Sequence, residues 1–242
     1  MKTVIVIPAR MGSTRFPGKP LVHLAGKPMV EWVYRAAIDS SCADEVVIAT
    51  PDQEILQAAA HFGAPAILTR QDHPSGTDRL AEVADSLAAD VFVNLQGDEP
   101  LIDSATIRAC ANALQASPTA HASSVYAECS ESEVDEPSAV KVVLRSDETA
   151  LYFSRYSLPY PRNRRELPVW KHIGIYAYRP ETLRRFVALG PSPLELTEGL
   201  EQLRLLENGM QIQMVQGVAS PISVDTPEQA VTANELLLLR GA

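Results

Sequence analysis

Three basic residues near the amino terminus have the types and spacing to bind a polyphosphate. Arg10, Arg15 and Lys19 fall within ten residues in the segment PARMGSTRFPGKP. Guanidinium and ammonium groups bind phosphate oxygens through charge-assisted hydrogen bonds, and Gly12 and Gly18 permit turns and close approach to a ligand. A solvated basic loop explains three isolated cations equally well. The segment does not contain the Walker pattern G-x-x-x-x-G-K-[ST].

Asp98 is a candidate ligand of a divalent cation, and a second aspartate, Asp225, lies far along the chain. Asp98 follows the apolar run VFVNL, so we expect it at the carboxyl end of a strand, where open α/β sheets bind ligands. Mg²⁺ prefers oxygen ligands and is bound by one or two carboxylates together with phosphate oxygens. The segment GDEP is also typical of a turn. Asp225, ahead of Thr226-Pro227, is by itself better explained as a helix cap.

A run of small polar residues, Ser75-Gly76-Thr77-Asp78-Arg79, combines a turn with a cation one helical turn further on. Either Ser75 or Thr77 is a candidate N-cap. An ordinary capped helix start explains Thr77 without any ligand. Arg79 would place a cation on the first turn of that helix.

Positioning these side chains requires strands whose ends meet. Short apolar, β-branched runs alternate with segments of helical apolar spacing, which indicates strands buried on both faces and helices between them. The runs are 4–7, 45–49, 66–68 and 91–95, and the helical segments are 28–40, 52–62 and 77–88. This alternation predicts an α/β fold with a Rossmann-like mixed, mostly parallel sheet flanked by helices.

The pattern changes after about Pro118, where shorter strands are predicted. We interpret the chain as a single domain, 1–242, with a smaller antiparallel-rich lobe inserted at about 120–170. The polar, basic and proline-rich segment 159–168 is predicted to be a mobile loop that closes over a substrate. The remaining predicted elements are strands at 123–127, 140–144, 151–154, 171–178 and 211–215, and helices at 182–189, 197–207 and 227–238.

Composition and charge exclude several classes of function. The net charge of −9 provides no general basic field for a nucleic acid. No run reaches the roughly 18 apolar residues that a membrane helix needs. Three widely spaced cysteines suggest neither a disulfide framework nor a zinc site. We therefore expect a cytoplasmic protein with no nucleic-acid or membrane partner.

The segment R-x-x-S-T-R-x-P-G-K-P resembles the signature of the cytidylyltransferases that activate keto-acid sugars. Among them it most resembles the 3-deoxy-manno-octulosonate cytidylyltransferase (CMP-Kdo synthetase) family. Further motifs follow in the order of that family, and this order is more specific than any single match. They are DHPSGTDR (72–79), NLQGDEP (94–100), AVKVV (139–143), ALYFSR (150–155), HIGIY (172–176), SPLE (192–195), LEQLR (200–204) and VDTP (224–227).

The resemblance implies a fold of the nucleotide-diphospho-sugar transferase type and a nucleotidyltransferase reaction. The implied reaction is magnesium-dependent: CTP and 3-deoxy-manno-octulosonate (Kdo) form CMP-Kdo and pyrophosphate, for lipopolysaccharide biosynthesis. The metal would be held by Asp98 and Asp225. The implied partners are CTP and an eight-carbon keto-acid sugar, and the implied assembly is a homodimer.

The resemblance also assigns roles to residues that match the family's motifs. Arg10, Lys19, Asp98 and Asp225 are implied as catalytic. The implied nucleotide-binding residues are Arg10, Ser13, Arg15, Lys19, Ser75, Gly76 and Arg79. On the sugar side, a carboxylate and several hydroxyls must be held, and suitable donors and acceptors are Gln96, Arg155, Arg162, His172, Tyr176, Glu201 and Gln202.

A histidine such as His172 titrates near neutrality and could act as a general base, but we favour a residue that only forms hydrogen bonds. The family commonly has arginine immediately before this histidine, where this chain has Lys171. Because lysine lacks the planar fork of arginine, the geometry or sugar preference could differ.

Other functions remain open at this point. The same reaction on 8-amino-Kdo or another keto-acid sugar is the nearest alternative. A non-catalytic nucleotide-binding regulator is an alternative of a different class, although the presence of both carboxylates and both catalytic cations argues against it. A dinucleotide-dependent dehydrogenase is not supported, because no G-x-G-x-x-G follows the first strand.

Overall fold

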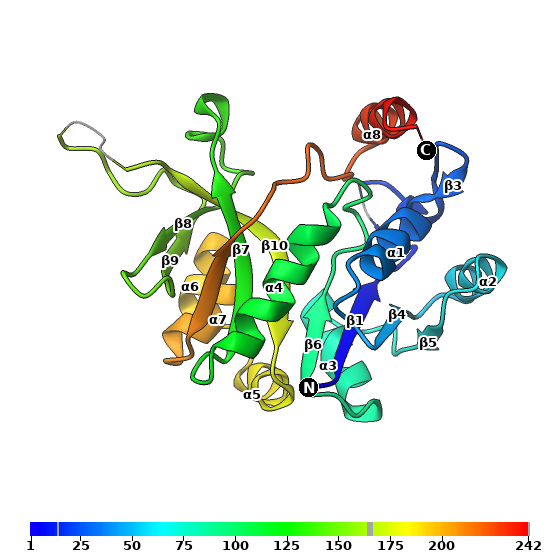
Figure 1. Ribbon diagram of the computed structural model, residues 1–242, viewed down its shortest axis with the longest axis horizontal. Coiled ribbons are helices and arrows are strands. Elements are labelled where there is room, and N and C mark those ends of the chain that lie inside the picture. Colours follow the sequence, from blue (N-terminus) through cyan, green and yellow to red (C-terminus); the bar gives the residue numbers. More distant parts are fainter. Residues whose placement is uncertain (14, 164–166, 242) are drawn as a thin grey trace.

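A mixed nine-stranded sheet forms the centre of the computed structural model, which describes residues 1–13, 15–163 and 167–241 (Figure 1). Its strands are β1 (Thr3–Pro8), β4 (Glu45–Thr50), β5 (Ala66–Leu68), β6 (Val91–Asn94), β7 (Ala122–Glu128), β8 (Lys141–Leu144), β9 (Ala150–Ser154), β10 (Trp170–Tyr178) and β11 (Ile212–Gln216). The spatial order is β11-β7-β10-β6-β1-β4-β5, and β8 pairs with β10 and β9. A separate ribbon pairs β2 (His23–Leu24) with β3 (Lys27–Pro28).

Helices cover both faces of the sheet. They are α1 (Met29–Asp39), α2 (Gln53–His61), α3 (Gly76–Ser86), α4 (Ser104–Ala116), α5 (Pro180–Leu189), α6 (Pro193–Glu198), α7 (Gln202–Glu207) and α8 (Pro227–Leu239), with the 3₁₀ helices η1 (Lys19–Leu21) and η2 (Glu131–Glu133). Buried residues of α1, α2 and α4 share one core with the sheet, and those of α3, α5 and α7 share the other. The result is a three-layer α/β arrangement.

The sequence of strand β1 is continuously apolar because both of its faces are buried. Val4 and Val6 belong to the core on the α3 side, whereas Ile5 and Ile7 belong to the core on the α1 side. A strand buried on both faces cannot alternate apolar with polar residues. The predicted Rossmann-like α/β fold with a mixed sheet is confirmed.

The neighbouring strands β4, β1 and β6 are parallel to one another. Their carboxyl ends therefore lie at the same edge of the sheet. The backbone N–H of Leu95, just after β6, donates to the carbonyl of Val6 at 3.0 Å. This pairing places the loop that follows β6 beside the loop that follows β1.

A third, smaller core attaches the carboxyl-terminal helix to the amino-terminal ribbon. Leu24 of β2, Val224 and Ala230 of α8 are among its members, and α8 lies next to β3 in Figure 1. The backbone N–H of Val224 donates to the carbonyl of Asp98 at 2.9 Å. This contact brings Asp225 to the edge of the sheet where β1 and β6 end.

Helix α4 was not predicted, although its signals are present in the sequence. Asp103 caps it by accepting a hydrogen bond from the backbone N–H of Thr106 at 2.8 Å. Ile107, Cys110 and Leu114 then follow at helical spacing and are buried. A capping aspartate followed by this periodicity is the pattern that identifies a helix.

The single helix predicted at 197–207 is wrong, because two short helices stand there. Helix α6 begins earlier, where Ser192 and Glu195 form a capping box. It ends at Gly199, which adopts a left-handed conformation with φ of 64°. Such a glycine terminates a helix at low cost, and α7 starts three residues later.

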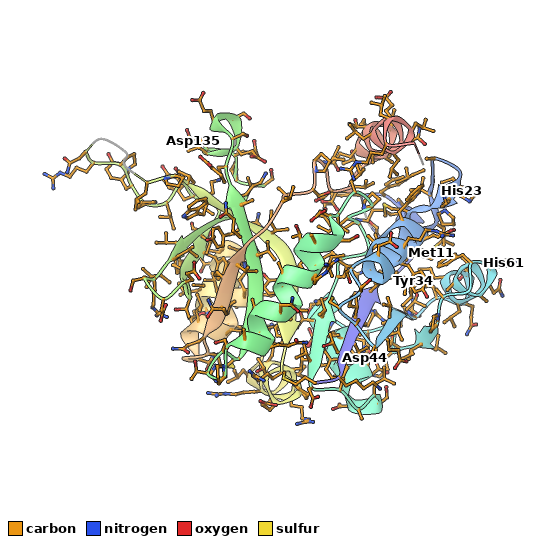
Figure 2. All side chains as sticks on the ribbon, in the orientation of Figure 1. Met11, His23, Tyr34, Asp44, His61 and Asp135 are labelled. Carbon is orange, nitrogen blue, oxygen red and sulfur yellow. The ribbon has the colours of Figure 1, made fainter. Side chains whose placement is uncertain are left out.

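The region 120–170, predicted as a smaller lobe, is rich in antiparallel pairing. However, its first strand, β7, belongs to the central sheet, between β11 and β10. The segment that projects from the body follows β7 and contains η2, with Asp135 near its tip (Figure 2). Within the described ranges, none of the helices has the length and apolar character that crossing a membrane requires.

Candidate active site

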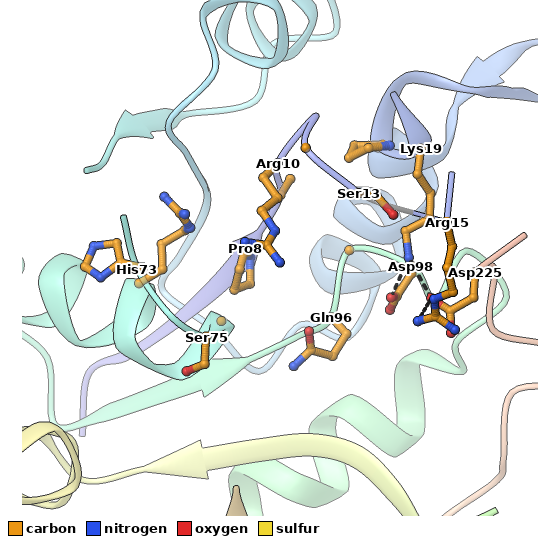
Figure 3. A pocket seen from close by; sticks show the side chains of 16 residues that line it. Pro8, Arg10, Ser13, Arg15, Lys19, His73, Ser75, Gln96, Asp98 and Asp225 are labelled. Carbon is orange, nitrogen blue, oxygen red and sulfur yellow. Dashed lines mark hydrogen bonds and ion pairs between the residues drawn. The ribbon is translucent and has the colours of Figure 1, made fainter. Parts of the chain in front are cut away.

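A cavity of about 310 Å³ lies at the carboxyl ends of β1 and β6 (Figure 3). The loop after β1, the start of α3, the loop after β6 and the segment before α8 form its wall. It gathers all residues predicted for the nucleotide and the metal, and one predicted for the sugar. These are Arg10, Ser13, Arg15, Lys19, Ser75, Gly76, Arg79, Asp98, Asp225 and Gln96.

The ammonium group of Lys19 lies between the two candidate metal ligands. Its Nζ donates to Asp98 Oδ2 at 2.9 Å and to Asp225 Oδ1 at 3.0 Å. Arg15 makes a further ion pair with Asp225 at 3.2 Å. The dashed lines in Figure 3 show that these groups form one cluster at one end of the cavity. The two aspartates therefore converge, as the predicted metal pair requires.

Electrostatics keep Lys19 charged. Burial lowers the pKa of Lys19, but the negative charge of Asp98 and Asp225 and the hydrogen bonds to them outweigh burial and raise the pKa overall. The next residue, Glu99, behaves differently: burial raises the pKa of its carboxyl to about 7, although the hydrogen bond from Ser223 lowers it. An aspartate pair with a charged lysine thus lies beside a carboxyl that holds its proton more tightly.

Asp225 is not the cap of α8. Thr226 is the N-cap, its hydroxyl accepting from the backbone N–H of Gln229, and Pro227 occupies the first turn. The interpretation of Asp225 as a helix cap is therefore wrong, because the threonine beside it fills that role. Its carboxylate is left to face Lys19 and Arg15.

The opposite end of the cavity contains the start of α3. Ser75 is the N-cap, and its Oγ accepts from the backbone N–H of Asp78 at 3.1 Å, so the capping role predicted for Ser75 or Thr77 belongs to Ser75. Helix amino termini favour negative charge. Arg79, on the first turn, is buried and donates to Thr69 Oγ1 and to the carbonyl of Arg70.

Arg79 therefore supports the wall of the cavity with the same guanidinium that we predicted to bind the nucleotide. Burial lowers the pKa of Arg79, and the charge of Arg10 lowers it further. The two cations thus lie within electrostatic reach of each other. An anion placed between them would be stabilised by both.

Sequence reasoning gave no role to His73, which is buried in the cavity wall. Its Nε2 forms a short hydrogen bond with Glu82 Oε2, from the second turn of α3. Glu82 also accepts from the backbone N–H of Arg70 at 3.1 Å. Because His73 lies within the motif DHPSGTDR, the sequence could have indicated it as a site residue. Nothing in the spacing indicated Glu82 as its partner.

The sugar-side residues, apart from Gln96, do not line this cavity. Glu201 lies beside Ser75 and Thr77: burial raises the pKa of its carboxyl, and the hydroxyls of these residues lower it. Gln202 is buried at the start of α7. Among the sugar-side residues, Glu201 thus lies next to a residue that lines the cavity.

His172 and Tyr176 lie together on β10, with ring centroids 5.2 Å apart. Burial lowers the pKa of His172 to about 3, and burial raises the pKa of Tyr176. Nε2 of His172 is 2.8 Å from Ser124 Oγ. A base this weak removes a proton from a sugar hydroxyl poorly, which favours a hydrogen-bonding role for His172.

Arg155 uses its donors within the chain. Its guanidinium donates to the carbonyls of Glu198, Pro137 and Gly199 at 2.8, 3.1 and 3.2 Å. To bind a sugar carboxylate it would have to give up some of these bonds. Arg162 is exposed in the segment 159–168. The predicted closure of that segment includes residues 164–166, which lie outside the described residues.

Lys171 forms an ion pair with Glu133 of η2. Its side chain thus links β10 to the projecting segment. The effect predicted for this lysine on sugar preference stays a prediction.

Comparison with known proteins decides the family. A sequence model described as cytidylyltransferase matches residues 4–212. The chain belongs to the cytidylyltransferase family. It is accordingly an enzyme of the nucleotidyltransferase class. Relatives named 3-deoxy-manno-octulosonate cytidylyltransferase include those of Acidobacterium capsulatum, 48% identical with 97% of this chain and 96% of the relative covered, and Escherichia coli, 45% identical with 97% and 98% covered.

Solved structures agree with the family assignment. The structure of CMP:2-keto-3-deoxy-manno-octonic acid synthetase complexed with CTP matches with a TM-score of 0.96 and 43% identity, over 99% of this chain and 100% of that one. The 4-diphosphocytidyl-2C-methyl-D-erythritol synthase of Anaerococcus prevotii matches with a TM-score of 0.68 over 98% of each chain. At 13% identity, the second match shows the fold alone.

The residues of this cytidylyltransferase fit a magnesium ion. Oxygens of Asp98 and Asp225 already converge on a cation, the ammonium of Lys19. Mg²⁺ is usually held by one or two carboxylates together with substrate phosphates. Two carboxylates at the end of the cavity that also contains Lys19 and Arg15 satisfy the protein's share of that ligand set.

Replacement of Gly97 by alanine tests the contact between the two loops. A Cβ at this position would lie 2.9 Å from the carbonyl oxygen of Pro8, so the loops after β1 and β6 would have to separate. This separation would displace Asp98, which is the next residue. We therefore expect kcat/KM for the cytidylyltransferase reaction to fall by about 10- to 100-fold. Gly174→Ala is the matched control, because a Cβ there meets no atom within 4 Å. Equal activities of both variants would contradict the expectation.

Replacement of His172 by glutamine tests its burial. Its pKa is about 3 in the folded protein and about 6.5 in an unfolded chain. Below pH 6.5 the unfolded state therefore binds a proton that the folded state does not, and stability is lost as pH falls. The wild type should lose part of its free energy of unfolding when the pH is lowered from 7 to 5. Over the same range we expect His172→Gln to lose less than the wild type, by up to about 2 kcal/mol.

Urea denaturation at the two pH values measures this difference. His23 is exposed, so His23→Gln should lose stability like the wild type. Identical losses in the wild type and His172→Gln would show that His172 is not desolvated.

Proposed function

We propose that this enzyme catalyses the magnesium-dependent transfer of the cytidylyl group of CTP to 3-deoxy-manno-octulosonate, forming CMP-Kdo and pyrophosphate. The observation that carries the proposal is full-length similarity: curated relatives named for this activity are 42–49% identical and cover 96–100% of this chain. The cavity supports it with cations at one end and a helix amino terminus at the other.

The chemistry needs no nucleophile from the protein. The anomeric C2 hydroxyl of the sugar would attack the α-phosphorus of CTP in line. A bond from the sugar oxygen to that phosphorus forms, and the hydroxyl proton is released to solvent. The bond to the bridging oxygen breaks, and pyrophosphate leaves with the electron pair. Transfers of this kind depend on positioning and on neutralisation of charge.

The chain's own residues supply both. Arg10, Arg15 and Lys19 would bind the triphosphate and stabilise the negative charge of the departing pyrophosphate. Asp98 and Asp225 would hold Mg²⁺, which when bound supplies positive charge against the phosphates. Ser13 would add a hydrogen bond from the same loop.

The cytidine would lie toward α3. Ser75 and Gly76 line that part of the cavity, and Arg79 holds its wall. Glu201 lies beside Ser75, so a sugar next to the α-phosphate would come between the loop of Gln96 and the start of α7. His172, Tyr176, Gln202, Arg155 and Arg162 stay predictions for the remainder of the sugar site.

The biological setting belongs to the same proposal. Activation of Kdo supplies lipopolysaccharide biosynthesis, and we propose a cytoplasmic homodimer for that role. The nearest alternative acceptor is 8-amino-Kdo, which differs from Kdo at one distant carbon.

Pyrophosphate release in the presence of Mg²⁺ tests the proposal. We expect release with CTP and Kdo and not with ATP, GTP or UTP. Release with 8-amino-Kdo and not with Kdo would move the acceptor to the alternative sugar. Absence of release with either sugar, from protein that binds CTP, would contradict the proposed acceptors.

A further inference from the structure

The carboxylate oxygens that a metal would need are already bound to an internal cation. Lys19 Nζ contacts Asp98 at 2.9 Å and Asp225 at 3.0 Å. The lysine side chain is only 12% exposed, and the aspartate side chains are 30% and 35% exposed. An ammonium held this closely by two carboxylates must be displaced or shifted before another cation can approach the same oxygens.

The protein also offers few metal ligands. In the described parts of the chain, no group of three or more histidine, cysteine, aspartate or glutamate side chains could hold a metal ion. Glu99, the carboxyl nearest in sequence, contacts Ser223 instead of joining the pair. Mg²⁺ keeps near-octahedral coordination, so two carboxylates alone leave most positions to water or phosphate.

We propose that Lys19 competes with the divalent cation for Asp98 and Asp225, and that the triphosphate relieves this competition by giving the ammonium a new anionic partner. The metal and CTP then bind as linked ligands, and the free enzyme binds the metal weakly. This inference rests on the proposed function, because it takes the triphosphate and the divalent cation as ligands of this cavity.

The physical reason is mutual repulsion between cations. Like charges a few ångströms apart in a partly buried site repel each other strongly, so the metal and an unmoved ammonium exclude each other. Four methylenes let the lysine head group move without a change in the backbone. Linkage is reciprocal: if CTP raises the affinity for the metal, the metal raises the affinity for CTP by the same factor.

The test measures Mn²⁺ binding to the full chain without nucleotide. The electron paramagnetic resonance signal of free Mn²⁺ reports how much of the metal remains unbound. We expect Lys19→Met to bind Mn²⁺ at least about tenfold more tightly than the wild type, since a repelling charge is removed. Arg10→Met is the matched control, because it removes a cation from the same cavity. Among the ion pairs of the described residues, none joins Arg10 to either aspartate. We expect it to change the affinity by less than about threefold.

A second variant identifies the oxygens involved. Adding Asp98→Asn to Lys19→Met should abolish the gain, because one of the two carboxylates is then lost. If Lys19→Met does not fold, as judged by thermal unfolding, Lys19→Gln serves in its place.

An unchanged Mn²⁺ affinity in folded Lys19→Met, or an equal gain in Arg10→Met, would overturn the inference. Its failure is distinguishable from failure of the proposed function. Pyrophosphate release by the wild type without any gain in Lys19→Met overturns the competition alone. A gain in Lys19→Met supports the competition even if the wild type releases no pyrophosphate with CTP and Kdo.

Discussion

Replacing Asp98 with alanine is expected to lower kcat for pyrophosphate release by about 10²–10³-fold. The carboxylate faces the cavity and contacts Lys19, so its loss removes a candidate metal ligand and one partner of a cation predicted to neutralise the triphosphate. The hydrogen bond from Val224 to Asp98 involves the backbone carbonyl. The segment should therefore stay in place, and the loss should fall on turnover and not on folding.

Steady-state kinetics at saturating CTP and Mg²⁺ measure this loss, and thermal unfolding checks the fold. Asp39→Ala is the control, because it removes the same charge at the exposed carboxyl end of α1, away from the cavity. It should retain wild-type turnover. Near-wild-type turnover in folded Asp98→Ala would defeat the assignment of Asp98 as a catalytic residue.

Replacing Glu195 with alanine should destabilise the protein by about 3–5 kcal/mol, because it leaves a buried arginine without its counter-charge. Glu195 and Arg204 are 7% and 4% exposed. They form a two-pronged pair, with Nε and an Nη of Arg204 at 2.7 and 2.5 Å from the two carboxylate oxygens. The same guanidinium lies over the ring of Phe186, 3.8 Å from its centroid. This pair joins α6 to α7, near Glu201 and Gln202.

Urea denaturation measures the change in the free energy of unfolding. The control is Asp85→Ala, which breaks a solvent-exposed pair with Arg184, at 3.9 Å and with side chains 71% and 65% exposed. Exposed pairs contribute at most about 1 kcal/mol. Similar losses of stability in the two variants would show that burial does not increase the contribution of the Glu195–Arg204 pair to the free energy of unfolding. Glu195→Gln, which keeps the shape, provides a second measurement if the alanine variant does not fold.

Local patterns were sufficient for most of the fold. The apolar runs of β1, β4 and β6 could be read as buried strands, because a strand covered on both faces has no polar alternation. Helix α4 was overlooked despite the cap at Asp103. One helix was predicted at 197–207, whereas the structure has a capping box at Ser192 and a left-handed Gly199 that set the bounds of α6. Such boundaries depend on single residues with special backbone conformations.

For the site, the sequence was informative about residue types and silent about their pairing. The cations of the first loop and Asp98 after β6 could be placed at strand ends, because parallel strands end at one edge of a sheet. The prediction that Asp225 caps α8 was wrong, because the neighbouring Thr226 fills that role. The partnership of His73 with Glu82 was not predictable, because it depends on how α3 packs against its preceding loop.

By itself, then, the sequence determined the α/β class, the position of the candidate site at the carboxyl ends of β1 and β6, and, through motifs in order, the cytidylyltransferase family. Only the tertiary structure brought Asp225 to Asp98 and placed Lys19 between them. The reason is physical: periodicity and capping act over a few residues, whereas this cluster forms through the core shared by β2 and α8 and the bond from Val224 to Asp98. Contacts over such separations depend on packing of whole elements, which no local pattern encodes.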